Sequence, residues 1–109
     1  MINAIMQFLG IVPETDYAGL VENGAIVVDV RSNEEFRQGH IKGAINIPLD
    51  HINNWFNTLE NKNQLIITCC ASGLRSRVAQ NILKLNGFPN VYNGGGWIRL
   101  GKKINDNEG

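Results

Sequence analysis

The stretch Leu65–Asn86, LIITCCASGLRSRVAQNILKLN, changes its hydrophobic period in the middle and so decides the fold. Its first four residues are apolar or β-branched, as in a strand that is buried on both faces of a parallel sheet. After Cys70 the apolar residues recur at the i, i+3, i+4 spacing of an amphipathic helix, at Val78, Ala79, Ile82 and Leu83. Gly87 follows in the place of a helix-ending glycine. Cys70 is therefore predicted to begin a turn from a buried strand into a helix.

This position would make Cys70 reactive. The turn Ala71–Arg75 leads into a helix N-terminus, for which we take Ser76 as the N-cap residue. Free backbone N–H groups and the positive end of the helix dipole would face the sulfur, and Gly73 would let the turn point its amides inward. Arg75 adds a fixed cation. The pKa of a free cysteine, about 8.5, falls to roughly 3.5–7.5 in such surroundings, so we expect Cys70 to be largely thiolate at neutral pH.

Patterns on both sides of this stretch alternate between helix and strand. In chain order they predict a helix that ends at Asn23–Gly24, a strand over 25–30, a helix over 32–38 with a Ser32/Glu35 capping box, a strand over 44–47 and a helix carrying Ile52, Trp55, Phe56 and Leu59. The alternation indicates an α/β fold with a mostly parallel central sheet and helices on both faces. Sites in such sheets lie at the carboxyl ends of the strands, where Asp29 and Cys70 both fall.

Three blocks of sequence, in order along the chain, resemble the rhodanese family of sulfurtransferases. Residues 70–76, CASGLRS, fit the C-x-x-G-x-R-S active-site loop of that family. Upstream, 28–31 (VDVR) resembles its D-x-R strand end, and 35–48 (EFRQGHIKGAINIP) resembles its E-F-x-x-G-H-I-x-G-A-x-N-I-P signature. Downstream, 91–97 (VYNGGGW) is similar to its late strand and glycine turn. One block would be weak evidence, whereas three blocks in family order cover most of the chain.

The resemblance implies a rhodanese-like fold and a two-step transfer of sulfur. The Cys70 thiolate would attack the sulfane sulfur of thiosulfate or another persulfide, and a thiol, cyanide or protein acceptor would then take that sulfur from the resulting cysteine persulfide. Cys70 and Arg75 would be the catalytic residues, with no cofactor and no metal. The substrate would be bound by the rest of the loop, which comprises Ala71, Ser72, Gly73, Leu74 and Ser76. Arg77 follows this motif, and it is interpreted either as a substrate-binding residue that attracts an anionic donor or as a solvated residue of the first helical turn.

Two loop positions depart from the family pattern. Ala71 and Leu74 stand where family members that use thiosulfate well often carry basic or polar groups. Fewer cations at the mouth of the loop would weaken the capture of a dianion. We therefore hypothesise that thiosulfate is a mediocre donor, and that a protein persulfide or a low-molecular-weight persulfide is a better one.

Other polar residues have simpler structural interpretations. Cys69 would be the last residue of the buried strand, pointing away from the loop, so we interpret it as a structural thiol. Asp29, Arg31 and Glu35 are interpreted as an ion-pair set that joins the strand end to the following helix, with Arg31 and Glu35 four residues apart. His40 lies in the structural G-H-I segment of the resemblance, and neither histidine has a second ligand at helical spacing. We therefore expect no metal site.

Length and composition set broader limits. A chain of 109 residues is expected to form one domain over 1–109, in which Ile5, Phe8 and Leu9 pack on the sheet and the polar tail 102–109 frays. Ten basic and ten acidic residues cancel, which argues against nucleic acid as a partner. No apolar run approaches the roughly 20 residues of a membrane span. Two adjacent cysteines form no disulfide framework, so we expect a reducing compartment, the cytoplasm.

Two other functions stay open at this stage. The first is a noncatalytic binding or regulatory module, and the retained Cys70 argues against it. The second is a phosphatase or arsenate reductase, since such enzymes on the same fold also use a cysteine and an arginine in one loop. The resemblance implies that their loop is one residue longer, whereas four residues separate Cys70 from Arg75. The sequence thus favours sulfur transfer and leaves the physiological donor, acceptor and oligomeric state open.

Overall fold

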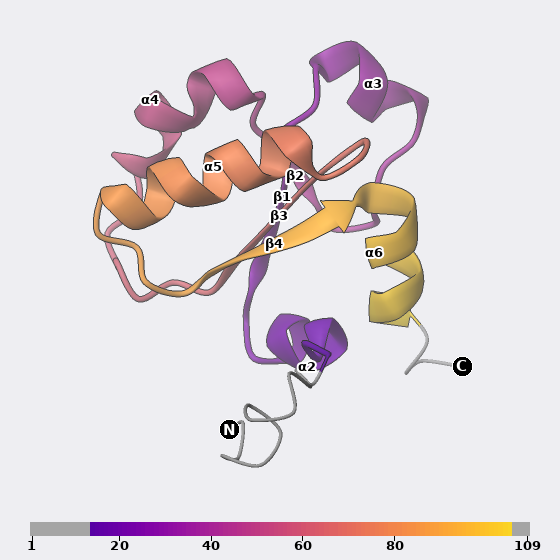
Figure 1. Ribbon diagram of the computed structural model, residues 1–109, viewed down its shortest axis with the longest axis horizontal. Helices are drawn as coiled ribbons and strands as arrows, with labels where there is room; N and C mark the ends of the chain where they lie inside the picture. The colour runs from indigo at the N-terminus through magenta and orange to yellow at the C-terminus, as the bar shows by residue number, and fades with distance from the viewer. Residues whose placement is uncertain (1–13, 106–109) are drawn as a thin grey trace, which may run out of the picture.

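The computed structural model describes residues 14–105, which form one sheet with helices around it (Figure 1). The elements are α2 (Tyr17–Glu22), β1 (Ile26–Asp29), α3 (Asn33–Gln38), β2 (Ile45–Asn46), the 3-10 turn η1 (Leu49–His51), α4 (Ile52–Phe56), β3 (Ile66–Cys70), α5 (Leu74–Leu85), β4 (Val91–Gly96) and α6 (Trp97–Asn105). The strand order is β2-β1-β3-β4, and every neighbouring pair is parallel. The predicted α/β fold with a parallel central sheet is therefore confirmed. The expectation for Ile5, Phe8 and Leu9 lies outside the described residues.

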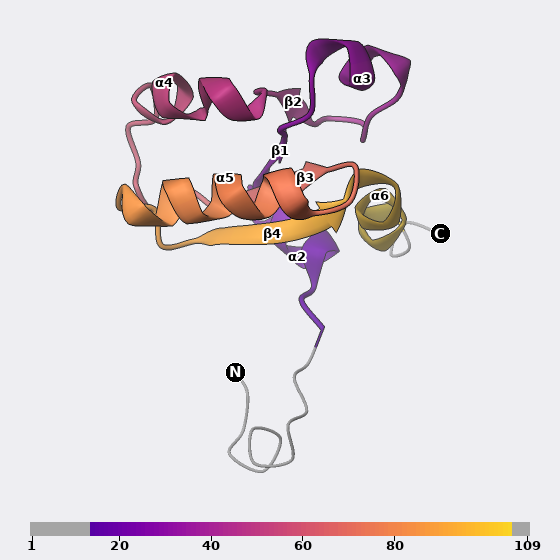
Figure 2. The same ribbon diagram turned by 45° about the horizontal axis from the view of Figure 1, so that its top comes forward.

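Helices cover both faces of the sheet (Figure 2). On one face α4 and α5 enclose a core with Ile66, Leu83 and Phe88, and on the other α2 and α6 enclose a second core with Ile67 and Leu100. Successive residues of a strand point to opposite faces, so β3 contributes to both cores in turn. The alternation continues to the end of the strand: Cys69 belongs to the second core and Cys70 to the first. The two cysteines therefore face different environments, as predicted.

The helix after Cys70 begins earlier than the sequence predicted. Strand β3 continues through Cys70, the turn comprises only residues 71–73, and α5 starts at Leu74 with Gly73 as its N-cap residue. Gly73 has φ +104°, a left-handed conformation that glycine adopts without a steric cost. The assignment of Ser76 as the N-cap was therefore wrong. Its side chain lies instead on the buried stripe of α5 together with Ala79 and Leu83, which leaves Val78 47% exposed.

Two further boundaries differ from the sequence predictions. Helix α4 ends at Phe56, so Leu59 lies beyond the helix although it still packs on the first core. The segment 102–105, which we expected to fray, forms the end of α6. Its Ile104 lies four residues after Leu100, and both side chains are buried against the sheet. This buried pair holds the helix on the sheet, although most residues of the segment are polar. Residues 106–109 lie outside the described part of the chain.

Glycines in β4 allow two neighbouring segments to approach the strand closely. A Cβ atom on Gly94 would lie 2.7 Å from Leu100 Cδ2 and 2.9 Å from Ile67 Cγ2. A Cβ atom on Gly96 would lie 3.0 Å from the carbonyl oxygen of Ala71. Between residues 93 and 96, β4 contains one residue more than the paired segment of β3, which is a β-bulge. The glycine run therefore brings both α6 and the Cys70 loop against the end of the sheet.

The approach of α6 predicts opposite effects for two glycine-to-alanine substitutions. Gly94→Ala would overpack the second core and lower the free energy of unfolding by about 1–3 kcal/mol. Gly101→Ala is the matched control. Gly101 lies inside α6, and its Cβ atom would make an ordinary 3.4 Å contact with Ile41. It should raise that free energy by about 0.5–1 kcal/mol through helix propensity. Urea unfolding followed by circular dichroism measures both, and equal stability of the two variants would contradict the packing argument.

Candidate active site

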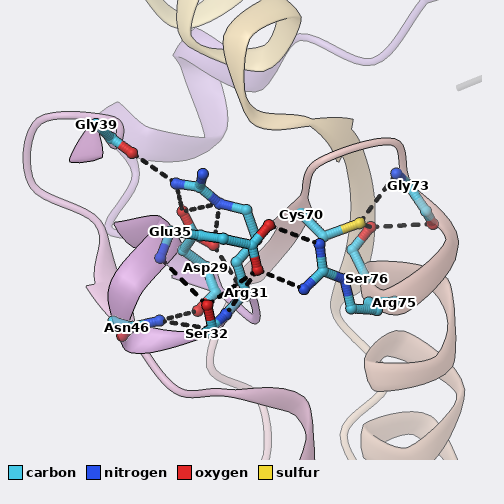
Figure 3. A network of polar contacts seen from close by, with 10 residues as sticks. All are labelled: Asp29, Arg31, Ser32, Glu35, Gly39, Asn46, Cys70, Gly73, Arg75 and Ser76. Carbon is cyan, nitrogen blue, oxygen red and sulfur yellow. Dashed lines mark hydrogen bonds and ion pairs between the residues drawn. The ribbon is translucent and has the colours of Figure 1, made fainter. Parts of the chain in front are cut away.

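Cys70 lies at the carboxyl end of β3, where the chain folds back over its sulfur (Figure 3). The backbone N–H of Gly73 donates to Cys70 Sγ over 3.0 Å, and the thiol donates to Ser76 Oγ over 3.5 Å. The residue is fully buried. Its sulfur is thus held inside a short turn, with one edge against polar groups of the loop and the first turn of α5.

Hydrogen bonds decide the ionisation of Cys70. Burial is the largest single effect and by itself raises the pKa of this thiol. The Ser76 side chain and the backbone amides of Ser76, Gly73 and Ser72 oppose it, and together they bring the pKa of Cys70 below its ordinary value. Cys69 is equally buried without such donors, and burial raises its pKa to about 12. The pKa values of the two adjacent thiols therefore shift in opposite directions, because the loop donates hydrogen bonds to only one of them.

Asn93, in β4, completes the hydrogen-bond network around the sulfur. The Ser76 hydroxyl donates to Asn93 Oδ1 over 2.6 Å, and the N–H of Gly95 donates to the same oxygen over 3.0 Å. Asn93 Nδ2 donates to the carbonyl of Gly73 over 3.4 Å. A hydroxyl has only one proton to donate. While Cys70 is a thiol, the Ser76 hydroxyl accepts from it and donates to Asn93. When Cys70 is a thiolate, the hydroxyl must rotate to donate to the sulfur. The sequence reasoning missed Asn93, although a polar residue near the carboxyl end of a strand was a signal.

Arg75 forms an ion pair that crosses from α5 to α3 (Figure 3). Its two terminal nitrogens donate to the two carboxylate oxygens of Glu35 over 2.7 and 3.0 Å. This bidentate bond is the main reason why the pKa of Glu35 falls to about 2. The same Glu35 accepts from Ser32 in the predicted capping box. We expected Asp29, Arg31 and Glu35 to form one ion-pair set. This expectation was wrong for Glu35, whose partner is Arg75.

Asp29 and Arg31 form a separate, buried ion pair. The guanidinium donates to the Asp29 carboxylate over 2.7 Å, and this hydrogen bond is the main cause that raises the pKa of Arg31. The same Arg31 nitrogen donates to the carbonyl of Gly39 over 2.7 Å, and its carbon Cζ lies 4.5 Å from the ring centre of Trp97. The pair thus connects the end of β1 to the segment after α3 and to the start of α6.

Four other residues that were predicted to bind the substrate lie at the protein surface. Ala71, Ser72, Leu74 and Arg77 are exposed, and Leu74 is 75% exposed. Beside the loop lies a pocket of about 430 Å³. The sequence reasoning did not anticipate it, because it did not consider residues 98–101 and treated 102–109 as a tail. Its lining consists of Ala71, Ser72, Gly96, Ile98, Arg99 and Lys102.

The site offers a nucleophile and hydrogen-bond donors. Within residues 14–105, no group of three or more His, Cys, Asp and Glu side chains is arranged to hold a metal ion. No helix in that range is both long enough and apolar enough to cross a bilayer. A thiolate inside a ring of N–H donors can attack an electrophilic sulfur, and the same donors can then hold the charge that forms on it.

Comparison with known proteins gives relatives that include a thiosulfate sulfurtransferase and a tRNA uridine(34) hydroxylase. Thiosulfate sulfurtransferase GlpE of Haemophilus influenzae is 34% identical over 102 residues, which cover 86% of this chain and 91% of GlpE. The tRNA uridine(34) hydroxylase of Aster yellows witches'-broom phytoplasma is 34% identical over 96 residues, which cover 83% of this chain but 31% of the hydroxylase. The chain therefore spans nearly the whole of one relative and about a third of the other.

Solved structures and the family comparison agree with these relatives. A rhodanese from E. coli, solved with anions, is 34% identical with a TM-score of 0.65 over 69% of this chain and 89% of that one. The sequence pattern of the rhodanese-like domain matches residues 14–97, a range that includes β1 to β4 and the whole Cys70 loop. Because this match agrees with the parallel sheet and with the cysteine loop at its carboxyl edge, the chain belongs to the rhodanese-like domain family.

Proposed function

We propose that this domain is a sulfurtransferase that carries a sulfane sulfur on Cys70. The supporting observation is the thiol itself, whose pKa is lowered by the hydroxyl of Ser76 and the amides of the loop despite full burial. In the first step the thiolate attacks the outer sulfur of thiosulfate or a persulfide. A new S–S bond forms on Cys70, the S–S bond of the donor breaks, and sulfite or a thiolate leaves. A thiol, cyanide or protein acceptor then takes the outer sulfur.

The proposal gives the loop residues distinct roles. Amides of residues 71–76 hold the negative charge on the outer sulfur, and the N–H of Gly73 already points at Cys70 Sγ. Arg75 acts as a positioning residue, since its guanidinium is bound to Glu35 and thereby fixes the first turn of α5 against α3. This pairing leaves Arg75 committed to a carboxylate, which favours sulfur transfer over an enzyme that needs the arginine for an oxyanion.

The relatives support the same reaction at a coarser level. GlpE is named a thiosulfate sulfurtransferase, while the hydroxylases that the chain also resembles are about three times longer than the matched region. We propose that residues 1–109 act as one rhodanese-like domain. A thiol that must stay reduced fits the cytoplasm, where disulfides are rare. The donors and acceptors proposed are small sulfur compounds and thiols or proteins.

The covalent intermediate predicts a mass change that depends on one cysteine. After incubation with thiosulfate or a persulfide donor, the protein should gain about 32 Da, one sulfur atom, and lose it again with cyanide. Cys70→Ser should abolish the gain, because the nucleophile is removed. Cys69→Ser is the matched control and should retain it, since that thiol faces the opposite core with a pKa of about 12. Intact-mass spectrometry without an adduct from any donor would favour a noncatalytic binding module.

The hydroxyl of Ser76 predicts a change in the pH dependence of Cys70. Ser76→Ala removes the strongest of the groups that lower the pKa of Cys70, so the pKa should rise and alkylation by iodoacetamide at pH 7 should slow about tenfold. The alkylation rate depends on the fraction of thiolate, so the midpoint of the curve of rate against pH should move to higher pH.

Ser72→Ala provides the control for this experiment. Ser72 donates to the sulfur through its backbone amide, which the substitution retains. Its alkylation profile should match that of the unaltered protein. If Ser76→Ala also matched it, the hydroxyl would have no part in stabilising the thiolate.

A further inference from the structure

We propose that Arg99 and Lys102 of α6 form a subsite that binds the anionic part of the sulfur donor. The cations that the Cys70 loop lacks would thus be supplied by another element of the fold. This inference rests on the sulfur-transfer function proposed above and specifies the donor class: a sulfane-sulfur compound whose leaving group is an anion.

The pocket beside the loop brings these two cations close to the residues that follow the nucleophile. Its lining includes Ala71 and Ser72, which directly follow Cys70, together with Arg99 and Lys102 of α6. The loop and α6 meet there because Gly96, also in the lining, allows the end of β4 to approach the carbonyl of Ala71. A donor whose sulfur lay at the loop would therefore have its other end beside α6.

The charge of this pocket is positive and uncompensated. Arg99 and Lys102 are three residues apart on α6, a spacing that puts them on the same side of a helix, and both are exposed. Within the described part of the chain neither forms an ion pair, whereas the adjacent Lys103 lies 3.6 Å from Glu14. No acidic side chain lies among the lining residues. Both cations are thus available to an incoming anion.

Sulfur transfer creates a need for such cations. A Cys70 thiolate repels an anionic donor, and a cleft lined with the opposite charge can raise association rates by about 10- to 1000-fold. During transfer the Cys70 sulfur forms a bond to the outer sulfur, and the electron pair of the donor's S–S bond leaves with the sulfite or thiolate. The net charge is unchanged, but negative charge moves from Cys70 towards the leaving group. Fixed cations around that group would stabilise this movement.

The size of the pocket bears on the source of the anion. A volume of about 430 Å³ lies within the roughly 300–1000 Å³ range of pockets that bind small organic ligands. Thiosulfate and the persulfide of a carboxylate-bearing thiol share the required chemistry, and the pocket has room for the larger one. The expectation that thiosulfate is a mediocre donor considered only Ala71 and Leu74 of the loop. Cations on α6 would weaken that expectation, because they supply the positive charge that the loop lacks.

The test compares donors of different charge on one double variant, Arg99→Gln/Lys102→Gln. The rate constant for persulfide formation on Cys70 is measured with thiosulfate, glutathione persulfide and cysteamine persulfide, whose leaving groups differ in charge. We expect the thiosulfate rate at low salt to fall about tenfold or more and to lose most of its salt dependence. The rate with glutathione persulfide, which is also anionic, should fall too if the larger donor uses the subsite. The cysteamine donor, whose carbon chain carries an ammonium and no carboxylate, should react as fast as before or faster.

Lys84→Gln is the matched control, since Lys84 is an exposed cation in the last turn of α5, away from the pocket. It should leave all three rates unchanged. Equal losses with all three donors in the double variant would overturn the proposal, because they would indicate damage to the nucleophile. Unchanged rates with both anionic donors would overturn it as well. A loss with thiosulfate alone would support the subsite and restrict it to the small dianion.

A separate measurement distinguishes failure of the subsite from failure of the proposed function. If no donor forms an adduct on the unaltered protein, sulfur transfer by Cys70 is wrong. The subsite is then tested by titrating thiosulfate into the Cys70→Ser protein and following the backbone amide signals of residues 71–72 and 96–102 by NMR. Saturable shifts that the two glutamine substitutions weaken would support anion binding. The absence of such shifts, or shifts that the substitutions leave unchanged, would overturn it.

Discussion

The buried ion pair between Asp29 and Arg31 holds together the elements that surround the cysteine loop. Its guanidinium contacts the end of β1, the carbonyl of Gly39 and the ring of Trp97 at the same time. A buried charge is stable only when it is paired and its remaining hydrogen-bonding groups are satisfied, and Arg31 meets this condition in one fixed geometry. Arg31 thus ties the segment after α3 and the start of α6 to the end of β1. Glu35 on α3 pairs with Arg75 at the start of α5, and Arg99 on α6 lines the pocket beside the loop.

The neighbouring thiols Cys69 and Cys70 show how one strand creates two chemical environments. Both are fully buried, and without hydrogen bonds burial would raise the pKa of each thiol. The pleat of β3 directs one into the core under α6 and the other under the loop. Hydrogen-bond donors reach the sulfur of Cys70, because the turn and the start of α5 lie on that side. The geometry of the strand end thus gives the two thiols opposite pKa shifts.

The proposed reaction divides the management of charge between two elements. Loop amides lie close to the sulfur and act on the charge that remains on Cys70. Side-chain cations on α6 line the adjoining pocket, where the leaving group would be. Backbone amides are rigid and short-ranged, whereas Arg and Lys side chains extend further and attract ions over roughly 10 Å at ordinary salt. Such a division would allow the donor preference to change through α6 without altering the loop.

The sequence by itself determined the features that depend on local pattern. The change of period after Cys70, the Ser32/Glu35 capping box and the alternation of elements predicted the parallel sheet and placed the cysteine at its carboxyl edge. Only the tertiary structure decided which distant residues meet there. Glu35 pairs with Arg75 across 40 positions, and Asn93 reaches Ser76 from another strand. Arg99 and Lys102 line the pocket beside the loop, where a glycine run in β4 permits a close approach. Such contacts follow from packing between elements, which periodicity along the chain does not encode.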